Sequence, residues 1–145
     1  MSDFTETSDD LIGTSVPGGT YSLAGFEDWI LRDTVYAGDS DHAHPIAAFI
    51  GAQRGMGVSV SEFFTLLRTS IDDGPVLAET TIELEEDITR DRTYRVEGEV
   101  RDVRRKHGAA FGDFDLITCE FRLVCDRTVA ARVTNVYAVK RGGIQ

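Results

Sequence analysis

Four side chains able to carry protons lie within six consecutive residues in the first third of the chain. Asp39, Asp41, His42 and His44 belong to the segment 36–46, which holds two of the three histidines of the sequence. A carboxylate beside an imidazole can exchange protons near neutral pH, as general acid–base catalysis requires. A solvated acidic loop would have the same composition, so the flanking elements decide the interpretation.

Helices are expected on both sides of this segment. Apolar residues at helical spacing predict an amphipathic helix over residues 26–35, which Gly38 ends. A short helix is expected over residues 45–53, with proline in its first turn, followed by an interruption at residues 54–57. A helix over residues 58–68 should face the core and be buried on most sides, because Val60, Phe63, Phe64 and Leu67 follow the i, i+3, i+4, i+7 spacing.

Strands are expected elsewhere. A short strand over residues 20–23 precedes the helices, and a turn at residues 72–75 ends the helical half. Period-two alternation then predicts four strands with one wet and one buried face, and hairpin turns at residues 106–108 and near 126–127. The residues expected to face inward are Val76, Ala78, Thr80, Ile82, Leu84, Tyr94, Val96, Gly98, Val100, Ile117, Cys119, Phe121, Leu123, Cys125, Val129, Ala131, Val133 and Tyr137.

This order of elements predicts an α+β fold in a single domain. An antiparallel sheet that buries a helix on one face gives a curved sheet wrapped around a central helix, the hot-dog arrangement. We place a flexible acidic N-terminal tail at residues 1–17, the folded domain at 18–140 and a C-terminal tail at 141–145.

The composition excludes several classes of function. A net charge of −10 over 145 residues argues against binding to nucleic acid or to an anionic membrane. No apolar run approaches the roughly 18 residues that span a bilayer, and the acidic start is unlike a signal peptide, so we expect a cytoplasmic protein. Cys119 and Cys125 would lie about 20 Å apart along one strand, too far for a disulfide, and no spacing suggests a metal site or a cofactor.

The segment 38–44 resembles a motif of the MaoC-type hot-dog proteins, which include (R)-specific enoyl-CoA hydratases and 3-hydroxyacyl dehydratases. Their motif reads Gly-Asp, any residue, Asn-Pro-Ile-His; this chain reads Gly-Asp-Ser-Asp-His-Ala-His, keeping the Gly-Asp pair and the final His. Arg54-Gly55-Met56 is similar to the family's later His-Gly-Met step. The likeness covers residues 18 to 140. The Asn-Pro-Ile centre and the His before Gly-Met are replaced here.

The resemblance implies hydration of an α,β-unsaturated thioester or the reverse dehydration, with Asp39 and His44 activating water and transferring the proton. Gly55, Met56 and Gly57 would offer backbone N–H groups to the thioester oxygen, although a plain turn also explains the glycines. For His42 we favour an exposed loop histidine over an assisting base, and Ser59 is a further assisting candidate. The implied substrate is an acyl-CoA or acyl-carrier-protein thioester, and the implied assembly is a homodimer or larger.

Two alternatives and one binding hypothesis remain. Glu62 on the expected central helix could serve a hot-dog thioesterase, or the chain could be a non-catalytic subunit that completes a partner's pocket. The basic residues Arg104, Arg105 and Lys106 stand out on an acidic protein, and they could contact the phosphates of coenzyme A or of a carrier-protein arm.

Overall fold

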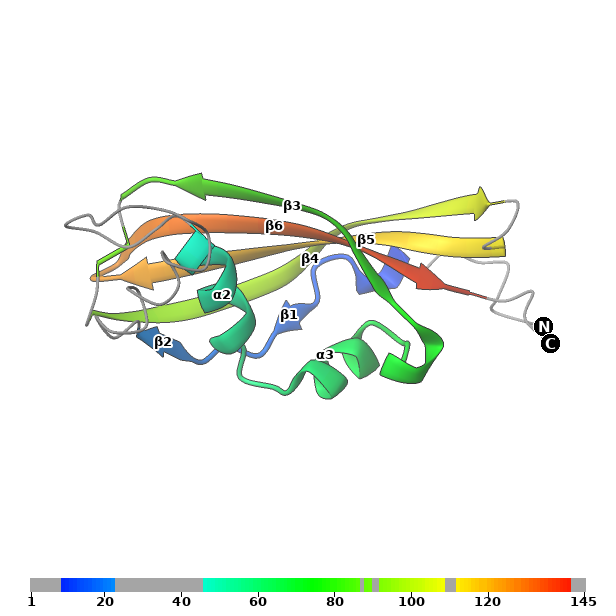
Figure 1. The fold of residues 1–145 in the computed structure, drawn as a ribbon, viewed down its shortest axis with the longest axis horizontal. Helices are drawn as coiled ribbons and strands as arrows, with labels where there is room; N and C mark the ends of the chain where they lie inside the picture. The colour runs from blue at the N-terminus through cyan, green and yellow to red at the C-terminus, as the bar shows by residue number, and fades with distance from the viewer. Residues whose placement is uncertain (1–8, 23–45, 87, 90–91, 109–111, 142–145) are drawn as a thin grey trace.

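The computed structural model describes residues 9–22, 46–86, 88–89, 92–108 and 112–141 (Figure 1). The expected helix over residues 26–35 lies outside these ranges. None of the described helices is long and apolar enough to cross a membrane. In chain order the elements are η2 (Asp9–Leu11), β1 (Ser15–Val16), β2 (Thr20–Ser22), α2 (Ile46–Arg54), α3 (Val60–Leu66), η3 (Ile71–Asp73), β3 (Val76–Leu84), β4 (Thr93–Gly108), β5 (Gly112–Cys125) and β6 (Thr128–Lys140).

The strands form one antiparallel six-stranded sheet in the order β1-β4-β5-β6-β3, and β2 pairs with another part of β4. The long strands β4, β5 and β6 twist across the molecule, and α2 and α3 lie against one face of the sheet (Figure 1). The predicted α+β fold, with a curved antiparallel sheet around a helical segment, is therefore confirmed. We call the face that carries the helices the inner face and the opposite one the outer face.

The helix that packs most closely on the sheet is α2. Its Ala47, Ala48 and Ala52 are fully buried, and a Cβ on Gly51 would lie 2.6 Å from the Tyr21 ring and 3.0 Å from Leu123. Small side chains let the helix approach the strands, because bulk here would displace core side chains. The expectation of a mostly buried helix over residues 58–68 was wrong: within α3 only Phe63 is buried, since the helix borders the core instead of crossing it.

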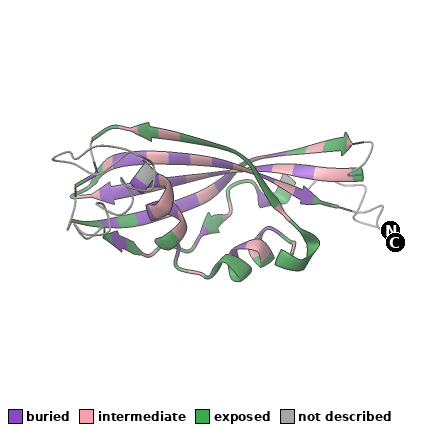
Figure 2. Cartoon of the chain, viewed as in Figure 1, coloured by how far each residue is buried: buried purple, intermediate pink, exposed green. Residues whose placement is uncertain are grey.

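Register shifts reverse which residues face inward, and sequence alternation did not reveal them. One shift lies between Leu77 and Glu79, so Val76 points outward and is 51% exposed, contrary to expectation. Another lies between Val100 and Asp102 and turns Arg105 inward. An extra residue in one strand moves every later side chain to the other face. Figure 2 shows the resulting alternation along β4 to β6 and the exposure of β3.

The two hairpin predictions differ in outcome. Residues 106–108 are not a turn, because β4 runs to Gly108. The turn at Asp126 and Arg127 is confirmed, and both residues have positive φ angles (51° and 67°), as in the two-residue turns that match strand twist.

Both cysteines are free thiols, as predicted. Cys119 is fully buried, and burial raises its pKa to about 12. Cys125, the last residue of β5, is only half-buried and packs against the edge of the core.

The folded unit extends beyond both predicted boundaries. Leu11 and Val16 are buried, and Gly13 N donates to the Val100 carbonyl at 2.8 Å, so this segment packs against the sheet and β1 forms part of it. At the other end the side chain of Arg141 is only 10% exposed and bonds to buried Asp115.

Candidate functional site

The proposed acid–base residues Asp39, His42 and His44 lie outside the described residues, so their placement stays a prediction. The described chain resumes at Ile46, the first residue of α2 and the second after His44. The helix that follows the motif is thus the one that packs most closely on the inner face. The connection from α2 to α3 holds most of the remaining candidates.

Gly55 and Gly57 lie where α2 ends and the chain turns toward α3. Gly55 N donates to the Gly51 carbonyl at 2.8 Å, and Gly57 N donates to the Pro17 carbonyl at 2.6 Å. These two N–H groups are therefore engaged and not free for a thioester oxygen. Of the predicted trio, only Met56 has an N–H with no backbone acceptor among the described residues.

Close packing explains both glycines. A Cβ on Gly55 would overlap the Val96 side chain and lie 2.8 Å from the Gly51 carbonyl oxygen, and one on Gly57 would overlap the Gly18 carbonyl. The connection is pressed against the β1–β2 segment, where Gly18 and Met56 form an isolated bridge. Close packing is therefore enough to explain why both positions are glycine, without a role in substrate binding.

Ser59 and Glu62 cap the start of α3. The Ser59 hydroxyl accepts a hydrogen bond from Glu62 N at 3.1 Å, and Glu62 Oε1 accepts one from Ser59 N at 2.8 Å. This reciprocal capping box satisfies two backbone donors that a helix leaves unpaired. The bond from the Ser59 backbone holds the pKa of Glu62 below its usual range. A general base works best with a pKa near the operating pH, so this environment suits capping better than base catalysis.

A buried polar chain that the sequence analysis missed joins the edge strand to α2. Thr80 Oγ1 donates to Asn135 Oδ1 at 2.5 Å, Asn135 Nδ2 donates to the Tyr137 hydroxyl oxygen at 3.1 Å, and Gln53 Nε2 donates to the same oxygen at 3.3 Å. Asn135 is fully buried. In the sequence, Asn135 interrupts the otherwise apolar residues of β6 that face inward, and this interruption was the signal that could have revealed the polar chain.

Tyr137 is the centre of this chain. Its ring packs edge-on against Phe63 and Phe64, with centroids 5.3 and 5.9 Å apart. Burial raises the pKa of the Tyr137 phenol, so it stays neutral and acts through hydrogen bonds, not as a base. The chain reaches Gln53, two residues before Gly55, and so fixes the end of α2.

The predicted basic trio is divided between the two faces of β4. The Arg105 side chain is 10% exposed on the inner side, and its Nε donates to Asp115 Oδ1 at 2.6 Å. Arg104 and Lys106 point outward; Arg104 is 72% exposed and pairs with Asp102 at 2.9 Å. The three residues therefore do not form one phosphate site.

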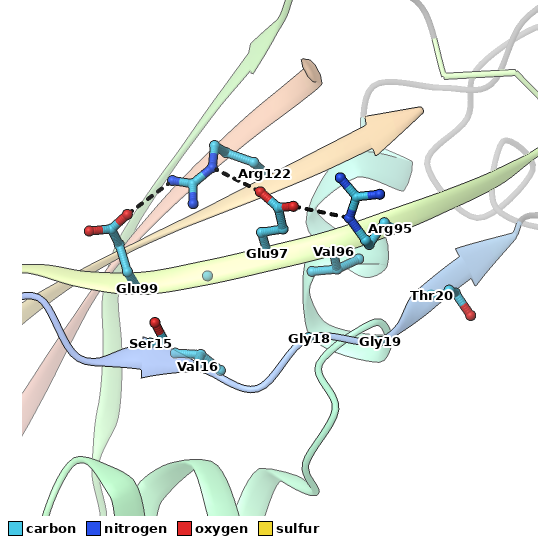
Figure 3. A pocket seen from close by; sticks show the side chains of 11 residues that line it. Ser15, Val16, Gly18, Gly19, Thr20, Arg95, Val96, Glu97, Glu99 and Arg122 are labelled. Atoms are coloured by element: carbon cyan, nitrogen blue, oxygen red, sulfur yellow. Dashed lines mark hydrogen bonds and ion pairs between the residues drawn. The ribbon is translucent and has the colours of Figure 1, made fainter. Parts of the chain in front are cut away.

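An open groove of about 530 Å³ runs along β4 beside β1 and β2 (Figure 3). Arg95 Nε lies 3.0 Å from Glu97, and Arg122 reaches Glu97 at 3.7 Å and Glu99 at 3.4 Å. These charges satisfy one another, and none of the candidate site residues predicted from the sequence lines the groove. Within the described ranges no group of three or more His, Cys, Asp or Glu side chains could hold a metal ion.

Comparisons of structure identify the architecture. The chain is similar to the HadBC (3R-hydroxyacyl-ACP dehydratase) complex of Mycobacterium tuberculosis, with a TM-score of 0.69 at 10% identity over 89% of this chain and 97% of that chain. The chain has the hot-dog fold.

Two further structures agree. The ChsH1–ChsH2 complex of M. tuberculosis matches with a TM-score of 0.66 at 12% identity, over 90% of this chain and 87% of that one. A MaoC-like dehydratase from Rhodospirillum rubrum matches with a TM-score of 0.55 at 16% identity, over 92% and 94%. No protein-family model and no curated protein sequence matches the chain.

Proposed function

We propose that this protein is a MaoC-like hydratase or dehydratase acting on an α,β-unsaturated or 3-hydroxyacyl thioester of coenzyme A or an acyl carrier protein. The observation that carries the proposal is the Gly-Asp…His segment at residues 38–44, which leads directly into the helix packed on the inner face of a hot-dog sheet. Structures of similar fold include a 3R-hydroxyacyl-ACP dehydratase and a MaoC-like dehydratase.

In this mechanism Asp39 and His44 hold one water, take its proton as the oxygen attacks Cβ, and supply a proton to Cα. Dehydration uses the same two groups in reverse. Because the N–H groups of Gly55 and Gly57 are engaged, Met56 N–H is the member of the trio left to polarise the thioester oxygen.

The chain provides matched controls for this assignment. Asp39→Asn and His44→Asn should each lower kcat for enoyl-thioester hydration by about 10²-fold or more, the usual contribution of one acid–base group. Asp41→Asn and His42→Asn alter neighbouring residues of the same type and should keep most of the activity. Equal losses in all four variants would show a general effect of loop charge and contradict the assignment.

The two alternative functions, a thioesterase and a non-catalytic subunit, predict different experimental results. A thioesterase using Glu62 would release free thiol, and Glu62→Gln would abolish the release although glutamine can still cap α3. A non-catalytic subunit would be inactive alone and active with a partner chain; the complexes HadBC and ChsH1–ChsH2 have similar folds.

We also propose that the protein is cytoplasmic and that two copies join through β3. That strand pairs only with β6 among the described strands, and its edge carries exposed Val76 and Leu77 (51% and 39%). An open strand edge offers backbone groups to a second strand. Analytical ultracentrifugation should give a dimer, and replacing an inward-facing edge residue, Leu77→Lys, should shift it toward monomer.

A further inference from the structure

The buried polar chain on the inner face ends beside the connection that carries the predicted thioester-binding residues. It starts at Thr80 on β3, passes through Asn135 and Tyr137 on β6, and reaches Gln53 in the last turn of α2. Gln53 precedes Met56 by only three residues. The polar chain therefore holds the last turn of α2 against the sheet where the connection to α3 begins.

Stability alone does not explain why these positions are polar. Asn135 is fully buried and Tyr137 is 4% exposed, and the inward residues on either side of them, Val133 and Val139, are fully buried and apolar. Replacing two hydrogen-bonded partners in a core by apolar groups of the same shape is often close to neutral, so a fully apolar row would stabilise the fold about as well. Hydrogen bonds add direction, because a satisfied buried network fixes one arrangement of the elements it joins.

The backbone on both sides of Met56 is anchored. Gly55 N donates to the Gly51 carbonyl at 2.8 Å. Gly57 N donates to the Pro17 carbonyl at 2.6 Å. The N–H of Met56 lies between these two, and among the described residues it has no backbone acceptor. A donor on fixed backbone is suited to charge that develops on an oxygen, because it needs no reorganisation during the reaction.

We propose that Tyr137 is a positioning residue for the hydration or dehydration reaction. Its hydroxyl holds Gln53 and thus the end of α2, so that the N–H of Met56 keeps the direction in which it polarises the thioester oxygen. This role rests on the proposed function and adds to it a residue that acts only through Gln53 and the backbone. Tyr137 takes no part in proton transfer.

Steady-state kinetics of crotonyl-CoA hydration by Tyr137→Phe test this role. The variant keeps the ring that packs edge-on against Phe63 and Phe64 and removes only the hydroxyl. Removal of one oxyanion donor lowers kcat by about 10²–10³-fold, so a donor that is only loosened should cost about tenfold. KM should stay within about twofold, because this interaction is made mainly in the transition state.

Two further variants separate positioning from stability. Gln53→Met breaks the same contact from α2 and should give the same loss, and Gln53→Met/Tyr137→Phe should lose little more than either alone, because both changes remove one interaction. The matched control is Tyr94→Phe. Tyr94 is 1% exposed, and its hydroxyl accepts from Thr89 N at 2.9 Å in the connection between β3 and β4. This variant also leaves a buried donor unpaired, so it should lower Tm but keep kcat within about twofold.

Hydrogen exchange followed by mass spectrometry reports on the connection without requiring activity. The amides of residues 55–58 should exchange about fivefold or more faster in Tyr137→Phe than in the wild type, and at the wild-type rate in Tyr94→Phe. Gln53→Met at a half-buried position repeats both measurements if Tyr137→Phe does not fold.

The possible failures can be told apart. An active wild type with equal kcat in Tyr137→Phe and Tyr94→Phe, or with a change in KM alone, would contradict the positioning role and leave the proposed function standing. A wild type that does not hydrate the thioester would contradict the proposed function, and hydrogen exchange would still decide whether Tyr137 holds the connection. Unchanged exchange at residues 55–58 in Tyr137→Phe would show that it does not.

Discussion

A buried carboxylate between two arginines should be the most sensitive single electrostatic position in the described fold. Asp115 on β5 is fully buried; its Oδ1 accepts from Arg105 Nε at 2.6 Å and its Oδ2 from Arg141 Nε at 3.0 Å. Arg141 also donates to the Leu67 and Arg68 carbonyls at 2.8 and 2.6 Å. The group therefore joins β4, β5, the end of β6 and the end of α3.

We predict that Asp115→Asn lowers the free energy of unfolding by about 3–5 kcal/mol. The change removes the carboxylate that both guanidinium groups contact, and each of these groups is only 10% exposed. A chain of 145 residues has a total stability of roughly 7–20 kcal/mol. The loss corresponds to a fall in Tm of roughly 10 °C.

Urea denaturation followed by circular dichroism measures this effect. The control is Asp113→Asn on the same strand, whose exposed carboxylate contacts His107 and should contribute less than about 1 kcal/mol. Replacing all three members by apolar residues, Asp115→Leu/Arg105→Met/Arg141→Met, should recover much of the loss, because no buried charge remains unpaired. If Asp115→Asn costs no more than Asp113→Asn, the buried network does not stabilise the fold as we reason.

Three further predictions concern single positions. Ser59→Ala removes the cap of α3 and should lower the free energy of unfolding by about 1 kcal/mol in urea denaturation. Glu62→Gln should leave enoyl-thioester hydration unchanged, and a loss of hydration in this variant would contradict a capping role. Arg127→Gly should raise the free energy of unfolding by about 0.5 kcal/mol, because φ is 67° there, and Arg127→Ala should give no such gain. Burial raises the pKa of Cys119 to about 12, so the folded state keeps a proton that the unfolded chain loses near pH 8.5. The free energy of unfolding should therefore fall as the pH rises above 8.5, by about 2 kcal/mol at pH 10. Cys119→Ala should remove this pH dependence in denaturation curves.

The elements could be predicted because their signals are local. Helical spacing, the interruption at residues 54–57 and period-two alternation gave the helices and four strands that the structure contains. The turn at Asp126 and Arg127 was also predicted from the sequence. Each of these features depends on residues within a few positions of one another.

The sequence could not predict which face of the sheet each residue occupies beyond a register shift. The register shift at Arg101 decides that Arg105 binds Asp115 while Arg104 and Lys106 point outward. A bulge is selected by how the whole sheet packs, which no local pattern encodes. The buried Asp115 network follows from that shift.

The candidate site was predicted less completely. Ser59 was predicted as an assisting residue and Glu62 as the carboxylate of an alternative thioesterase, whereas their reciprocal capping contacts appear only with the backbone geometry. The chain from Thr80 through Asn135 and Tyr137 to Gln53 combines three elements distant in sequence. Proximity in the fold, and not residue type, creates it.

The most direct test of the proposed function follows the absorbance of the conjugated enoyl-thioester band, using crotonyl-CoA with the wild-type protein and with Asp39→Asn. The proposal predicts that the band disappears with the wild type, that it persists with Asp39→Asn, and that no free thiol forms. Release of thiol by both proteins would contradict hydration and indicate thioester hydrolysis that does not use Asp39.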